Sequence, residues 1–187
     1  MNSAHLEFCA SPEWRTIVEE MILPDALRNA KLGTEAIEIG PGAGFTTDVL
    51  RKLTDHLIAV EVDPNLAVAL KSRLQGTNVE VVCGDATSLD FPDDRFSAAA
   101  SFHMLHHIAS DGAQNQALAE LARVLRQGGL LVAADGVFSE GSLAFHENDI
   151  YNPIDPESLR HRLELVGFVS VNVALHDLGW FCSAVAA

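Results

Sequence analysis

The sequence predicts an α/β fold, a doubly wound and mostly parallel sheet with helices on both faces. Short, almost continuously apolar segments alternate with helical patterns, as expected for strands that are buried on both faces. A glycine-rich turn at residues 40–44 joins the first apolar segment to a helix. The last two apolar segments are separated by a short turn around residues 177–179, so those two strands must be antiparallel.

Hydrophobic periodicity predicts the elements in order. Residues 12–30 are expected to form one or two amphipathic helices that Pro24 interrupts. Strands are expected at residues 35–40, 57–62, 78–83, 96–102, 130–134, 169–175 and 181–186. Further helices are expected at residues 45–53, after Asp63, around residues 118–125 and at 156–166, with a long irregular loop over 137–154.

Specific residues predict where one helix begins and where another ends. Asp63 followed by Pro64 is typical of an N-cap followed by a proline at the first helical position. Gly128 and Gly129 are expected to end the helix that contains residues 118–125, because glycine disfavours helical continuation.

Length, charge and cysteine content limit the class of protein. The chain has 187 residues, enough for one domain, and its 12 basic and 26 acidic residues give a net charge of −14 without a basic cluster. Because phosphate neutralisation supplies most of the affinity of nucleic-acid binders, we expect neither nucleic acid nor an anionic membrane as partner. The three cysteines form no Cys-x-x-Cys pair, which favours reduced thiols and a cytoplasmic protein. No signal peptide or membrane-spanning run is expected.

The glycine spacing distinguishes between two classes of nucleotide-binding loop. A dinucleotide fingerprint is Gly-x-Gly-x-x-Gly, whereas here glycines stand at 40, 42 and 44 and Phe45 takes the last position. Preceded by Glu38, this loop resembles the nucleoside-binding loop of class I S-adenosylmethionine (SAM)-dependent methyltransferases. The resemblance implies SAM as cofactor, strand order 3-2-1-4-5-7-6 with an antiparallel last strand, and one domain over residues 1–187 with residues 1–32 as a helical extension.

The same resemblance assigns cofactor-binding roles to residues at the strand ends. The loop would wrap the methionine and ribose of SAM, Glu38 would hold its amino end, and Glu61 would accept the ribose hydroxyls. Asp63 competes with Glu61 for that role, but its place before Pro64 favours a cap. The expected cofactor-binding set is Glu38, Gly40, Pro41, Gly42, Gly44, Glu61, Val62 (against adenine), Asp85 (to the adenine amino group), Ala86, Ser101 and Phe102.

Three histidines follow the fourth strand. The run around Leu105-His106-His107-Ile108 resembles a segment of the small-molecule methyltransferases of this family. His103, His106 and His107 are therefore candidate catalytic residues, since imidazole titrates near neutral pH and can act as a general base. The alternative is that they cap or pack against the next helix. No metal ion is expected, and the segment from Asp135 to residue 155 is expected beside the acceptor.

Together these features predict a SAM-dependent methyltransferase with a small-molecule acceptor. The sequence does not decide between a monomer and a homodimer. No Asn-Pro-Pro-Tyr motif follows the fourth strand, which disfavours methylation of amino groups on nucleic-acid bases. Two alternatives are kept: a nicotinamide-dependent oxidoreductase on the same topology, and a non-catalytic nucleoside-binding protein. Phe45 argues against the oxidoreductase.

Overall fold

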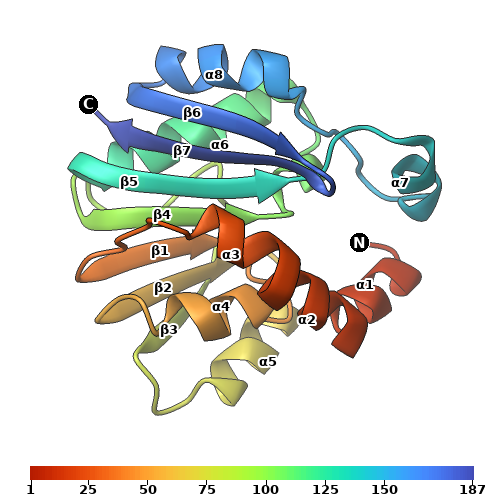
Figure 1. The fold of residues 1–187 in the computed structure, drawn as a ribbon. Coiled ribbons are helices and arrows are strands. Elements are labelled where there is room, and N and C mark those ends of the chain that lie inside the picture. The colour runs from red at the N-terminus through yellow and green to blue at the C-terminus, as the bar shows by residue number, and fades with distance from the viewer.

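The computed structural model describes residues 1–187 and contains a seven-stranded sheet in the order β3-β2-β1-β4-β5-β7-β6 (Figure 1). β1 pairs in parallel with β2 and β4, and β7 is antiparallel to both of its neighbours. The predicted strand order is therefore confirmed. The strands are β1 (Glu35–Ile39), β2 (His56–Glu61), β3 (Val79–Cys83), β4 (Phe96–Phe102), β5 (Leu125–Asp135), β6 (Phe168–His176) and β7 (Gly179–Ala186).

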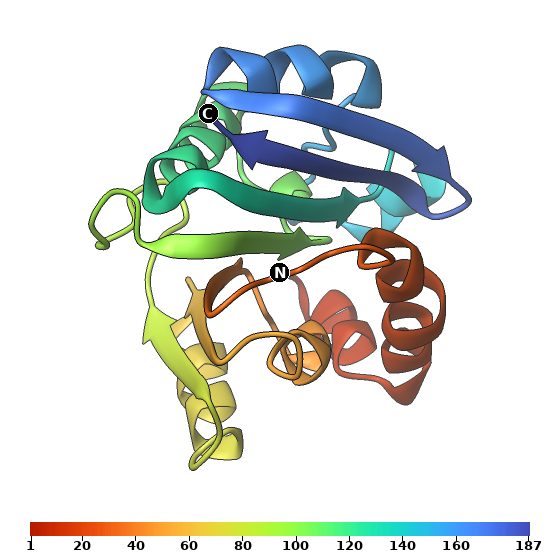
Figure 2. The ribbon, with the colours of Figure 1, turned by 60° about the vertical axis from the view of Figure 1, so that its left-hand side comes forward.

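Helices cover both faces of the sheet (Figures 1 and 2). They are α1 (Ser3–Cys9), α2 (Pro12–Ile17), α3 (Leu23–Ala26), α4 (Phe45–Leu50), α5 (Pro64–Arg73), α6 (Asp111–Val124), α7 (Glu140–Phe145) and α8 (Pro156–Leu165). A π-helical turn, Val18–Ile22, joins α2 to α3, and a 3-10 turn, Leu105–His107, follows β4. None of these helices has both the length and the apolar composition that a membrane span requires.

The strands are apolar on both faces because each face meets helices. In β1, Ile37 and Ile39 belong to the core beneath α6 and α8, whereas Ala36 belongs to the core beneath the π-helical turn and α3. A smaller cluster packs α5 against β2 and β3. Trp180 and Phe168 are the largest fully buried side chains at the β6–β7 edge. Burial on both faces explains the nearly continuous apolar segments of the sequence.

Three local predictions need correction. Gly128 and Gly129 lie within β5 and do not end α6, which stops at Val124. Leu125, whose side chain is buried, pairs through its backbone with Phe96 of β4 directly after the helix, so the strand begins earlier than its apolar run suggests. The expected loop over residues 137–154 contains α7, and α1 was not predicted. Pro24 lies in the first turn of α3, directly after the π-helical turn.

The topology directs the carboxyl ends of the parallel strands toward α1 and α7, which lie on the same side of the molecule in Figure 1. The chain order reverses between the neighbours β1 and β4. Loops that leave these strands therefore separate to opposite faces and leave a crevice, where open α/β sheets bind their ligands.

The cap of α5 supports a stability prediction. Asp63 Oδ1 accepts hydrogen bonds from the backbone N–H groups of Asn65 and Leu66, at 2.8 and 3.3 Å. Asp63→Ala should lower the free energy of unfolding by about 1 kcal/mol, measured by urea denaturation. Asp63→Asn keeps a capping oxygen and serves as the control that should stay near wild type. Equal losses in both variants would show that charge, not capping, is the stabilising factor.

Candidate functional site

A cavity of about 810 Å³ opens at the carboxyl ends of β1, β2, β3 and β4. The sheet side of its wall comes from the glycine loop and from the residues that follow β2, β3 and β4. The opposite side comes from α1, from α2 and from the segment around α7. The cavity therefore lies at the crevice that the topology creates, and it is closed by the N-terminal helices and by the segment around α7.

The glycine loop of residues 40–44 follows β1 and turns sharply into α4. Gly40, Gly42 and Gly44 all have positive φ, at 66°, 53° and 83°. A Cβ at Gly40 would collide with Met104, whereas a Cβ at Gly42 would meet no protein atom within 4 Å. Because Gly42 lines the cavity, that open space is where a ligand can approach the backbone closely. The loop therefore leaves room for a ligand against the backbone of Gly42.

Glu38 lies in β1 with its side chain almost fully buried. The hydroxyls of Thr46 and Thr47, in the first turn of α4, donate hydrogen bonds to its two carboxylate oxygens, that of Thr47 at 2.7 Å. Burial raises the pKa of Glu38 to about 7, although these hydrogen bonds oppose the shift. Its hydrogen-bond partners within the chain are thus the hydroxyls of two threonines. Glu38 fixes β1 to α4 on either side of the glycine loop.

Glu61 ends β2 and reaches the glycine loop. One carboxylate oxygen accepts a hydrogen bond from the backbone N–H of Gly42 at 3.0 Å, and the other accepts one from the backbone N–H of Asp63 at 3.0 Å. The side chain of Asp63 caps α5. Glu61 therefore lies at the cavity wall beside Gly42, whereas the carboxylate of Asp63 is used as the N-cap of α5.

The residues expected around adenine lie at the neighbouring strand ends. Val62 is 66% exposed although it is large and apolar, and it lines the cavity. Asp85 and Ala86 follow β3 and also line it. Oδ1 of Asp85 accepts hydrogen bonds from the backbone N–H and the hydroxyl of Thr87, both at 2.8 Å, which fixes the turn.

His103 and His106 follow β4 and line the cavity. His103 has a positive φ of 51°, and its ring meets Trp14 edge-on with the ring centroids 5.2 Å apart. Nδ1 of His106 lies 2.5 Å from a carboxylate oxygen of the fully buried Asp135, whose other oxygen accepts the backbone N–H of His106 at 3.1 Å. The carboxylate at the end of β5 therefore fixes the orientation of the imidazole at the end of β4.

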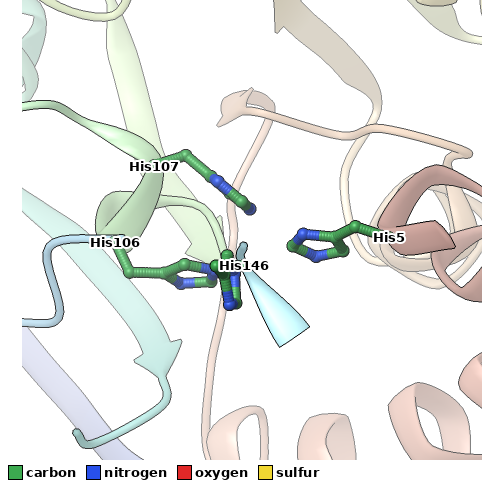
Figure 3. Close-up of side chains that lie close together, drawn as sticks. All are labelled: His5, His106, His107 and His146. Atoms are coloured by element: carbon green, nitrogen blue, oxygen red, sulfur yellow. The ribbon is translucent and has the colours of Figure 1, made fainter. Parts of the chain in front are cut away.

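Four histidines that line the cavity lie close together (Figure 3). They are His5 of α1, His106 and His107 of the 3-10 turn, and His146 directly after α7, and one ring nitrogen of each lies within 4.8 Å of those of the others. His5 was missed by the sequence analysis, and His146 was expected near the acceptor without a role. The signal for His5 was the N-cap: the Asn2 side chain accepts the backbone N–H of His5 and predicts a helix there.

Most of these imidazoles are neutral at pH 7. Burial lowers the pKa of His5 to about 4 and the pKa of His107 to about 3, and neighbouring imidazoles add to both shifts. Burial also lowers the pKa of His103 to about 4. For His106, burial acts in the same direction, but the charge of Asp135 and its hydrogen bond outweigh it and raise the pKa. Only His106 keeps the basicity that a general base near neutral pH needs.

Most of the predicted site residues line the cavity. These are Gly40, Pro41, Gly42, Gly44, Glu61, Val62, Asp85, Ala86, Phe102, His103, His106 and His107. Glu38 and Ser101 do not reach the wall; both are buried, Glu38 behind Thr46 and Ser101 within β4. Phe45, which replaces the dinucleotide glycine, lines the cavity and begins α4. The cofactor and catalytic roles themselves stay predictions.

The fold and the glycine loop together define a class I, Rossmann-like SAM-dependent methyltransferase. A family model described as a methyltransferase domain matches residues 37–133, which is more than half of the chain. The chain therefore belongs to the methyltransferase domain family, and SAM is the cofactor which that membership implies. The match covers the glycine loop and every strand end of the cavity. The oxidoreductase alternative is set aside.

Solved structures share this fold over most of the chain. The PH0226 protein from Pyrococcus horikoshii has a TM-score of 0.77 at 16% identity, covering 95% of this chain and 92% of that one. A SAM-dependent methyltransferase from Mesorhizobium loti has a TM-score of 0.74 at 13% identity, covering 90% and 99%. At such identities the likeness concerns the fold alone.

Relatives by sequence correct one prediction. A probable ribosomal RNA small subunit methyltransferase A of Methanothermobacter thermautotrophicus is 39% identical over 80 residues, covering 38% of this chain and 29% of the relative. One from Thermococcus onnurineus is 38% identical over 78 residues, covering 41% and 29%. This chain thus spans under a third of these two relatives' length. The sequence analysis excluded nucleic acid and expected a small-molecule acceptor, and the names of these relatives contradict that exclusion. The physical reason is that the net charge is an average over the whole surface, so it does not exclude a nucleic-acid substrate at one site.

Gly42 supports a prediction about cofactor binding. Gly42→Ala should lower SAM affinity at least tenfold, because its Cβ would occupy the space beside the backbone where the ligand fits. Gly76→Ala is the matched control, since Gly76 also has positive φ (80°) and no protein atom near its Cβ, but lies outside the cavity. Both variants should lose about 1 kcal/mol of stability. Calorimetric titration with SAM that gives equal affinities for the two variants would contradict the placement.

Glu38 supports a prediction about pH. Its pKa of about 7 in the folded chain lies above the ordinary 4.5, so the folded state binds more protons between these values. The stabilisation present below pH 4.5 is therefore lost as the pH rises to 7, by roughly 3 kcal/mol at most. Glu38→Gln lacks this titration. The difference in unfolding free energy between wild type and Glu38→Gln should fall over that pH range, and a constant difference would contradict the raised pKa.

Proposed function

We propose that this protein binds SAM along the glycine loop and transfers its methyl group to an acceptor that enters at the histidine end of the cavity. The observation that supports this most strongly is the open space above Gly42, bordered by the carboxylate of Glu61 and continuous with the cavity. Glu61 is assigned to the ribose hydroxyls, and Val62 and Asp85 to the adenine. When bound, SAM supplies a methyl group that is already activated by its sulfonium.

The chain contributes alignment and exclusion of water. The backbone of residues 40–44 is held from one side by Glu38 through the threonines of α4, and from the other by Arg73, which donates to the carbonyl oxygens of Ala43 and Gly44 at 3.2 and 3.1 Å. A rigid loop restricts the cofactor to one position relative to the acceptor. Such positioning accounts for much of the barrier reduction in group transfer. The aromatic side chains of Phe8, Trp14, Phe145 and Tyr151 line the acceptor end and limit the access of water.

The relatives' names make ribosomal RNA the acceptor to test first. An RNA base must leave its stack to reach a methyl donor at the bottom of a cavity, and extruded bases stack on aromatic side chains. Phe8, Trp14, Phe145 and Tyr151 provide such side chains at the acceptor end. The net charge of −14 opposes long-range attraction to phosphate, so binding must depend on these short-range contacts.

The acceptor is tested with labelled SAM. Small-subunit ribosomal RNA, assembled small subunits and a metabolite extract are incubated separately with the protein, and methyl incorporation is measured in each. We expect label in an RNA-containing sample, and none with Gly42→Ala under the same conditions. Incorporation only from the metabolite extract would contradict the RNA assignment while leaving methyl transfer intact. No incorporation in any sample would contradict the enzymatic proposal.

Glu61 tests the cofactor assignment separately from the acceptor. Glu61→Ala should weaken SAM binding by roughly 2–3 kcal/mol, because charge-assisted hydrogen bonds are lost. Asp63→Ala is the neighbouring control and should change stability more than affinity, since its carboxylate caps α5. Isothermal calorimetry with SAM and with NAD measures both effects, and NAD should not bind. The reverse ranking of the two variants would show that Asp63 holds the ribose.

A cytoplasmic location is kept as part of the proposal. All three cysteines, Cys9, Cys83 and Cys182, are free in the structure, and this supports a reducing compartment.

A further inference from the structure

The four histidines of Figure 3 form a cluster that methyl transfer by alignment does not use. They come from three segments that are far apart in the sequence: α1, the turn after β4, and the end of α7. His5, His106 and His146 are buried and His107 is half-buried. Packing of the next helix, the alternative from the sequence, does not account for the cluster, because α1 and α7 contribute two of its members.

The hydrogen bonds at the outer side of the cluster fix which nitrogen faces inward. Nδ1 of His106 lies 2.5 Å from the Asp135 carboxylate, and Nδ1 of His146 lies 2.6 Å from the carbonyl oxygen of Ser142. Both partners are acceptors, so each Nδ1 must carry the proton and donate it. Nε2 of each ring then presents a lone pair. An imidazole whose outer N–H donates to a carboxylate or a carbonyl is the usual arrangement of a metal-bound histidine.

Three ring nitrogen atoms of the cluster have no hydrogen-bond partner within the protein. Nε2 of His146, Nδ1 of His107 and Nδ1 of His5 are buried and make no hydrogen bond. Nδ1 of His5 lies 3.5 Å from the nearest carboxylate oxygen of Asp149, beyond good hydrogen-bond geometry. A buried polar atom without a partner is costly, and three in one cluster call for a common ligand.

We propose that His5, His106, His107 and His146 bind one divalent transition-metal ion of the Zn²⁺ type. A ligand set of imidazoles suits Zn²⁺, Ni²⁺, Cu²⁺ or Fe²⁺, whereas Mg²⁺ and Ca²⁺ require oxygen ligands. The nitrogen atoms lie within 4.8 Å of one another, so small rotations of the side chains suffice to bring them around one ion.

The contacts around the cluster indicate what the ion does to the structure. Asn2 already joins α1 to the chain after α7: its side-chain amide donates to the carbonyl oxygens of Phe145 and Glu147, at 3.0 and 3.2 Å. Its backbone N–H donates to Asp149 at 3.0 Å. An ion held by His5 and His146 strengthens the same junction. It therefore holds α1 and α7 closed over the acceptor end of the cavity, against the turn after β4.

Metal binding and general-base catalysis exclude each other at His106. Nδ1 is committed to Asp135, so a proton acceptor and a metal ligand would both have to use the lone pair of Nε2. Convergence of three further imidazoles favours ligation. The ion also lies where an acceptor would enter, so it is placed to bind the acceptor's nucleophilic atom if one coordination position stays open.

Metal binding is tested on the tag-free chain after removal of metal with a chelator. Calorimetry with Zn²⁺ alone should show one ion bound per chain, Mg²⁺ should not bind, and Co²⁺ should give the visible bands of a nitrogen-ligated ion. The double variant His5→Phe/His146→Phe keeps the aromatic packing and removes two ligands, and it should lose at least 100-fold in Zn²⁺ affinity. His161→Ala, an exposed histidine on α8, is the control and should bind as wild type does.

The melting temperature of the wild type provides a second measurement, which does not depend on whether the double variant folds. Zn²⁺ should raise the melting temperature of wild type and His161→Ala in a concentration-dependent way, and leave that of the double variant unchanged. Equal Zn²⁺ affinity in wild type and double variant, or no Zn²⁺ binding and no stabilisation in wild type, would overturn the proposal. These measurements use neither SAM nor an acceptor, so their failure is separate from failure of methyl transfer.

Discussion

The site depends on one buried carboxylate. Glu38 in β1 is bonded to Thr46 and Thr47 of α4, and the five residues between strand and helix have no freedom to spread apart. Two further side chains hold the same loop: Glu61 accepts a hydrogen bond from the backbone N–H of Gly42, and Arg73 of α5 donates to the carbonyl oxygens of Ala43 and Gly44. A carboxylate in the core is expensive unless it is bonded, and here its two threonines keep the loop in one conformation.

The cavity has two walls of different origin. The sheet wall consists of turns that follow β1, β2, β3 and β4, each built by a few consecutive residues. The opposite wall consists of α1, α2 and α7, and α1 meets α7 because the beginning of the chain packs against the segment after β5. A hydrogen bond from the backbone N–H of Asn2 to the carboxylate of Asp149 connects these two segments. The turns of the sheet wall are therefore each formed by residues close in sequence, whereas the opposite wall depends on contacts between segments that are distant in sequence.

Charge was a poor guide to the acceptor. A net charge of −14 describes the surface as a whole, whereas a methyl acceptor is selected by the few side chains at the end of the cavity. Those side chains are aromatic rings and imidazoles. In the proposed function these rings stack on a planar acceptor group, and their chemistry bears more directly on the choice of substrate than the average charge does.

The sequence by itself determined the alternation of strands and helices, the antiparallel last hairpin, the cap at Asp63 and the glycine loop with Glu61 beside it. These depend on periodicity and on neighbours within a few residues, which a single sequence displays. Its strand order came from family resemblance. The tertiary structure decided the partners of Glu38, the helix inside the expected loop, the early start of β5 at Leu125 and the meeting of His5 with His146. The partners of Glu38 lie only eight and nine residues away along the chain, but the turn of the glycine loop is needed to bring them to it. The early start of β5 and the meeting of His5 with His146 depend on which distant segments pack together, and no local pattern of residues contains that information.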